Sequence, residues 1–280
     1  MPTIEETRKE LSDAHKLLVQ QVNYTAKYCM GCRSGEKLSS QIQSTNQAWP
    51  PNVDSLLAAD SLIYRLAALK WHISLLRNIQ GQESKNLMDA HGTHGPSPQE
   101  VNNSLSRMGF VFDDIVFNSV SIFDYLAKFI CAVHFPGKDG ARRDWRGLVK
   151  PKNRLKLLDD ELSDKVNTIN YSWFRGLDKL RSHIIHNMVE VGGVELETNE
   201  LETGTEFYFD FFMPERATND LSVFASGDKF SIEPGATLIA LQSFARVSEV
   251  LSCISKIEYQ CLKNPSSLDC ISKPLDPSRP

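Results

Sequence analysis

Apolar residues recur every three or four positions in five separate stretches of the chain, and this spacing decides most of what the chain can fold into. An α-helix has about 3.6 residues per turn, so such spacing gathers apolar side chains on one helix face that has to be buried. The stretches lie at about residues 4–29, 54–79, 105–134, 164–191 and 236–262. We therefore expect a mainly α-helical protein built as a helical bundle.

One short region departs from helical spacing. Residues 206–212 are rich in aromatic side chains that alternate with a period of two, and they end before Pro214, which is typical of a β-strand. Val194–Thr198 and Leu221–Ile232 are predicted as companion strands. We expect a small antiparallel β-sheet, at about residues 193–232, inserted before the C-terminal helix.

Breaks in these patterns predict how the chain is divided. Residues 81–104 are rich in Gly, Ser, Asn and His and contain two X-Pro breaks, so they are predicted to be a linker. It would separate residues 1–80, which form either their own helical hairpin or an extension of the bundle, from a helical domain over residues 105–262. Four prolines in residues 263–280 predict a disordered tail.

Composition narrows the functional classes. The net charge of −4 excludes a globally basic nucleic-acid-binding chain, and no apolar run approaches the roughly 18 residues of a membrane span. The charged N-terminus does not resemble a secretory signal, and the six cysteines are dispersed, with no second pair to complete a metal site with Cys29 and Cys32. We expect a cytoplasmic protein with reduced thiols, no membrane span, no metal and no cofactor.

The most pointed motif is Arg181-Ser182-His183-Ile184-Ile185-His186, in which an arginine precedes a histidine on a predicted helix. Together with the helix at residues 112–128, this arrangement resembles the HEPN superfamily, whose helical domains carry an Arg-x4-6-His signature. The resemblance covers about residues 105–262. It implies a dimeric, metal-independent endoribonuclease or RNA-binding module, with Arg181 and His186 as catalytic residues. Active relatives usually place Asn, Asp or His after the arginine, and here Ser182 would orient His186 instead.

The chemistry of these residue types suits RNA cleavage. An imidazole that titrates near neutrality can exchange a proton with a 2′-hydroxyl, and a guanidinium can stabilise charge on a phosphate. Helical geometry nevertheless places Arg181 and His186 about 140° apart around the helix axis. Because Ile185 also lies off the main apolar stripe, we expect a homodimer whose interface includes residues 164–191. The alternative is that Arg181 pairs with a carboxylate and His186 is a surface or interface residue.

A basic segment adds a second hypothesis. Residues 138–156 contain eight basic and two acidic residues, so they carry +6 while the rest of the chain carries −10. Such a segment can anchor a phosphate backbone, with an embedded aromatic residue to stack on a base. The predicted RNA-binding residues are Arg142, Arg143, Trp145, Arg146 and Lys150. The alternative is a solvated loop that pairs with acidic helices.

Asp124 and Lys128 are four residues apart and therefore share a helix face. Some HEPN families carry an acidic residue four positions before a lysine at this place, so the resemblance implies that the pair supports the site. The alternative is an ordinary surface ion pair.

Two classes of function remain open from the sequence. The first is a HEPN-like endoribonuclease or RNA-binding module. The second is a non-catalytic HEPN-like protein that serves as a dimerising scaffold or partner-binding domain. Nucleotide binding, which the name of the superfamily suggests, has no supporting motif. The first two differ in whether His186 and the basic segment face a common groove.

Overall fold

The computed structural model describes the backbone of most of the chain and the side chains of a smaller part. The backbone is described for residues 4–45, 53–89, 96–134, 144–154, 160–186, 192–201, 204–224 and 229–263. The side chains are described for residues 5–26, 56–89, 96–132, 144–153, 160–186, 192–197, 209–224 and 229–254.

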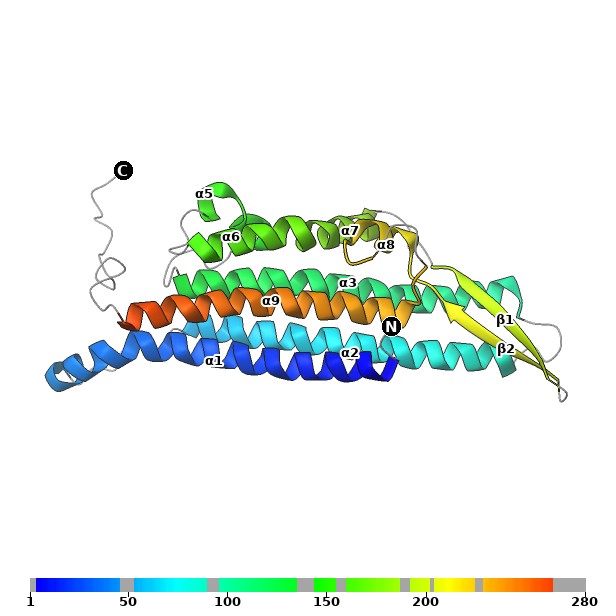
Figure 1. Cartoon of the computed structure of the whole chain (residues 1–280), viewed down its shortest axis with the longest axis horizontal. Helices are drawn as coiled ribbons and strands as arrows, with labels where there is room; N and C mark the ends of the chain where they lie inside the picture. Colours follow the sequence, from blue (N-terminus) through cyan, green and yellow to red (C-terminus); the bar gives the residue numbers. More distant parts are fainter. Residues whose placement is uncertain are drawn as a thin grey trace.

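Long helices lying side by side dominate the structure (Figure 1). These helices are α1 (Ile4–Thr45), α2 (Val53–Asp89), α3 (Pro98–His134) and α9 (Ile232–Lys263). Helix α2 runs antiparallel to α3, whereas α1 and α9 run parallel to each other. The second relation follows from two contacts, because Arg8 reaches Glu233 and Gln21 reaches Ser248. The predicted mainly α-helical bundle is confirmed.

A second layer packs on α3 and α9. It contains α6 (Asp160–Ile169), a π-helical turn η2 (Asn170–Phe174) and α7 (Arg175–His186), which continue one another. Two short helices, α4 (Trp145–Leu148) and α5 (Pro151–Arg154), precede it. The helix predicted over residues 164–191 thus begins earlier and contains a π-turn, and residues 187–191 lie outside the described part of the chain.

The predicted antiparallel sheet is confirmed as a two-stranded hairpin before α9. Strand β1 (Val194–Leu201) pairs with β2 (Gly204–Phe211), so that Val194 faces Phe211. The hairpin projects beside the end of the bundle where α2 ends and α3 begins (Figure 1).

The strand predicted over Leu221–Ile232 is wrong for the residues described there. Helix α8 (Glu215–Asp220) follows the hairpin, and the following segment forms a turn. It makes only an isolated bridge to the sheet, between Ser231 and Phe212, because α9 begins at Ile232 and turns the chain away. Residues 225–228 lie outside the described part.

One continuous hydrophobic core includes residues from all of the long helices, from Leu11 on α1 to Ile254 on α9. Among residues 1–80, apolar side chains from residues 5–26 and 56–80 therefore share the core of this bundle. The predicted tail beyond residue 263 lies outside the described residues.

Most of the linker predicted over residues 81–104 is helical. Helix α2 continues to Asp89 because Glu83 is buried against α3, where Ser104 and Arg107 donate hydrogen bonds to its carboxylate at 2.7 and 2.6 Å. Ser97 and Glu100 form a capping box at the start of α3, with Pro98 as the first helical residue. The Ser-Pro step is therefore a helix start, and only residues 90–95 lie outside the description.

Two helices, α3 and α9, are long and apolar enough to cross a membrane by length and composition alone. More than half of the most apolar window of each is buried inside the bundle, as core helices also require. The expected absence of a membrane span stays a prediction.

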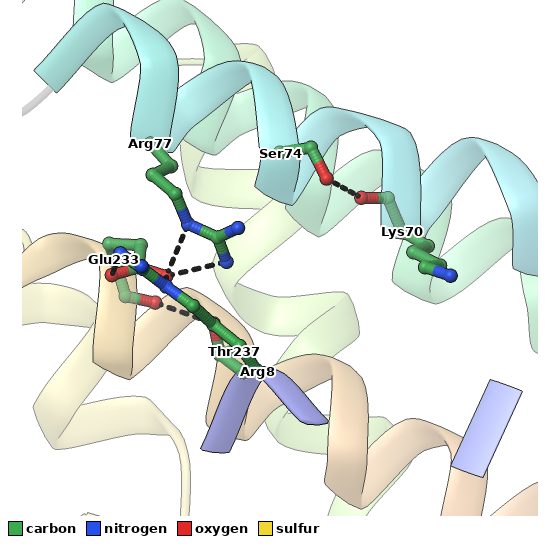
Figure 2. Close-up of polar contacts among 6 residues, drawn as sticks. All are labelled: Arg8, Lys70, Ser74, Arg77, Glu233 and Thr237. Carbon is green, nitrogen blue, oxygen red and sulfur yellow. Dashed lines mark hydrogen bonds and ion pairs between the residues drawn. The ribbon is translucent and has the colours of Figure 1, made fainter. Parts of the chain in front are cut away.

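A buried carboxylate connects three of the long helices (Figure 2). Glu233 at the start of α9 is only 6% exposed, and it accepts hydrogen bonds from Arg77 of α2 at 2.9 and 3.1 Å. Arg8 of α1 approaches the same carboxylate at 3.4 Å. A buried charge is tolerated only when it is paired in this way, so the three residues fix how α1, α2 and α9 meet.

We predict that Glu233→Gln lowers the free energy of unfolding by about 2 kcal/mol, because it leaves two arginines facing a neutral amide. Glu197→Gln is the matched control: Glu197 is exposed on β1, and its change should stay within about 0.5 kcal/mol. Chemical denaturation of both variants measures the two values. Equal values would mean that the Glu233 contacts contribute nothing to stability.

Candidate functional site

Trp145, predicted to stack on RNA bases, is instead a core residue. Its side chain is 0% exposed, and its ring packs against Phe123 and Phe174 with centroid distances of 5.2 and 5.8 Å. Burial of a large indole surface is strongly favourable, so this side chain anchors α4 onto α3 and η2. The prediction of an exposed stacking aromatic at this position is therefore wrong.

The helix that carries Trp145 is held by two aspartates. The side chain of Asp144 caps α4 by accepting from the backbone N–H of Gly147 at 2.7 Å. Asp124 of α3 accepts from the backbone N–H of Trp145 at 3.1 Å. Both carboxylates satisfy amides at the start of α4, where a helix leaves its N–H groups without partners.

Arg146, predicted to bind phosphate, already has a carboxylate partner. Its guanidinium donates to both oxygens of Asp178 on α7, at 2.7 and 2.5 Å. This hydrogen bonding raises the pKa of Arg146 above its usual value. Of the other predicted RNA-binding residues, Lys150 is exposed, and Arg142 and Arg143 lie outside the described residues.

Arg181 shares the same carboxylate. Its Nη2 lies 3.4 Å from Oδ1 of Asp178 and its side chain is 24% exposed. Its buried Nε has no hydrogen-bond partner among the described residues. Burial raises the pKa of Asp124, while the nearby charge of Arg181 acts in the opposite direction. The alternative drawn from the sequence, that Arg181 pairs with a carboxylate, matches this geometry.

We call Asp124, Asp144, Arg146, Asp178 and Arg181 the α4 ion cluster. It contains three carboxylates and two guanidiniums, so its charge is −1 when all five groups are ionised. Asp144 and Asp178 each raise the pKa of Asp124, which shows that the carboxylates repel one another. With all five groups ionised, a phosphate would enter this cluster against a net negative charge.

His186 is not part of the ion cluster. It is the last residue of α7 and is exposed, and Ser182 one turn earlier is partly exposed. Among the described residues, no hydrogen bond or ion pair joins His186 to Arg181 or Ser182. The two halves of the Arg-to-His motif therefore point to different surroundings, as the 140° separation predicts.

Asp124 and Lys128, predicted to form a supporting pair, have separate partners. Asp124 binds the start of α4, whereas the ammonium of Lys128 lies 4.3 Å from the ring centroid of Tyr125. A cation–π contact with a neighbouring ring replaces the expected ion pair.

No group of three or more His, Cys, Asp or Glu side chains is arranged to hold a metal ion within the described part of the chain. The carboxylates of the ion cluster are occupied by guanidiniums and backbone amides instead.

Two residues of the α4 ion cluster, Asp178 and Asp144, are not among the predicted site residues, but the sequence contains a partial signal for each. Asp178 stands three positions before Arg181, a spacing that lets two side chains on one helix turn meet. Asp144 directly precedes α4 as a capping residue. The pairing of Arg146 with Asp178 spans 32 residues and has no local signature.

Comparison with protein-family models, with curated proteins and with solved structures finds no match to this chain. The HEPN resemblance therefore stays a prediction that rests on the motif residues.

We predict that Arg181→Ala lowers the free energy of unfolding by about 1–2 kcal/mol, because it removes a positive charge from among three carboxylates. His186→Ala should change it by less than about 0.5 kcal/mol, because His186 is exposed. Chemical denaturation at pH 7 measures both. Equal losses, or a larger loss for His186→Ala, would contradict a structural role for Arg181.

Proposed function

We propose that this chain is a non-catalytic helical scaffold that acts by association with other protein surfaces. The observation that carries the proposal is the engagement of Arg181 by Asp178 while His186 lies exposed elsewhere on α7. A catalytic pair has to reach the same phosphodiester, with a charge stabiliser that is free to contact the phosphate. The engagement of Arg181 by Asp178, and the position of His186 about 140° around the helix axis from Arg181, support the scaffold over the catalytic pair in the part of the chain that the structure describes.

The surroundings of Arg181 add an electrostatic argument. Three carboxylates surround two guanidiniums in the α4 ion cluster, so the local field opposes a phosphodiester. The buried Trp145 also removes the aromatic surface on which a base would stack. Several helices expose large apolar side chains, and such side chains suit a surface that binds other proteins better than one that binds RNA.

RNA cleavage is the second candidate function, and the exposure of His186 favours it. An exposed imidazole at the end of α7 is accessible to a substrate, and Lys150 is an exposed cation on the preceding segment. Activity would then need a second chain to supply the cation that stabilises charge on the phosphate, because Arg181 is engaged by Asp178 in the ion cluster.

The two candidates are separated by incubating the purified protein with mixed RNA in EDTA, beside the His186→Ala variant. We predict that the protein and its variant leave the RNA equally intact. Metal-independent cleavage that yields 2′,3′-cyclic phosphate ends, and that falls by about 10²–10⁴-fold in His186→Ala, would contradict the scaffold proposal and establish the ribonuclease.

A further inference from the structure

Helix α2 carries a row of exposed apolar side chains on the face opposite its core contacts. The row consists of Leu57, Tyr64 and Trp71, which are 59%, 67% and 59% exposed. The residues are spaced by seven, so they lie one above another along about 20 Å of the helix. Spacing by seven is the repeat with which one helix packs lengthwise against another.

The opposite face of α2 is already fully used. Leu62, Leu66, Leu69 and Ile73 have no exposed surface, because they pack in the core of the bundle. Helix α2 is therefore apolar on two faces, of which only one is covered by the residues that the structure describes. A helix with apolar residues on both sides is typical of a helix that is covered on both sides.

Small side chains lie between the two aromatic residues of the row. Ala67 is exposed and Ala68 is partly exposed, midway between Tyr64 and Trp71. Two antiparallel copies of α2 with a twofold axis at this position place Tyr64 of each copy beside Trp71 of the other. The alanines then face each other at the axis and allow the helices to approach closely, so the row is complementary to itself.

We propose that a second copy of this chain covers the Leu57–Tyr64–Trp71 row, with the two α2 helices packed antiparallel. This dimer rests on the proposed scaffold function: the first partner of the scaffold is a second copy of the chain, and the row is the surface that binds it. It places the dimer interface on α2 and not on α7, where Ile185 is an exposed apolar residue beside the exposed, polar His186.

The size of the row suits the centre of such an interface. From the roughly 150–250 Å² that an aromatic side chain can bury, we expect the row to offer on the order of 300 Å² of apolar surface per chain. A stable dimer buries about 800 Å² per partner, with an apolar centre and a polar rim. Two exposed polar residues of α2 share the face of the row: Asp60 lies between Leu57 and Tyr64, and Asn78 lies one heptad beyond Trp71, where it would belong to the polar end of the interface.

The test compares three full-length proteins by sedimentation velocity between about 1 and 100 μM, a range in which a dimer with a dissociation constant below about 1 μM stays associated and a 100-fold weaker one dissociates. The row variant carries Tyr64→Gln and Trp71→Gln. The matched control carries Tyr171→Gln and Ile185→Gln, which remove two apolar side chains of similar exposure (60% and 54%) from η2 and α7. Circular dichroism checks that each variant keeps its helices, as exposed positions should allow.

We predict that the wild type and the control sediment at twice the chain mass of 31.6 kDa, and that the row variant dissociates at least about 100-fold more readily. A wild type of single-chain mass over the whole range would overturn the inference. A control that dissociates while the row variant remains dimeric would also overturn it and place the interface on α7. If the scaffold proposal itself is wrong, the separate incubation with RNA detects this as metal-independent cleavage.

Discussion

The carboxylate of Asp178 accepts two hydrogen bonds from Arg146 and lies within ion-pair distance of Arg181, so one acidic side chain holds two arginines. The same region is fixed to α3 through Asp124, which accepts from the backbone of Trp145. Helix α4 thus connects the two helical layers, and its tryptophan fills the space between them. Arg146 of the basic segment and Arg181 of the Arg-to-His motif, which taken alone suggest nucleic-acid chemistry, are parts of a packing interface through these contacts.

The helical periodicity of the sequence is sufficient to predict the main architecture, because the face of a helix that is buried is encoded every three or four residues. The apolar stripes on α2, α3 and α9 lie in the core, and the aromatic alternation predicted from residue 206 lies in β2, which ends at Phe211. The positions at which helices begin and end are predicted less well from the sequence. Glu83 extends α2 through a contact with α3, and Ser97 starts a helix at a Ser-Pro step that resembles a break.

The ion cluster could not be predicted in full, for a physical reason. Counting charges within residues 138–156 gives a strongly basic segment, but the charge that Arg146 experiences is set by Asp178, 32 residues away. Likewise, helical geometry separates Arg181 from His186 but does not reveal which carboxylate Arg181 meets. Glu233 is a further example, because its two arginines come from helices far away in the sequence (Figure 2). Burial turns such long-range pairs into the strongest determinants of local chemistry.

The central claim is that Arg181 serves the structure through Asp178, and a double-mutant cycle tests it most directly. Arg181→Met keeps the aliphatic part of the side chain, and Asp178→Asn keeps the shape of the carboxylate while removing its charge. Free energies of unfolding are measured for both single variants and for the double variant. We predict that the two changes are coupled by about 1 kcal/mol, so that the double variant loses less stability than the two single losses combined. Losses that add to within about 0.3 kcal/mol would show that Arg181 and Asp178 act independently, and would contradict the account.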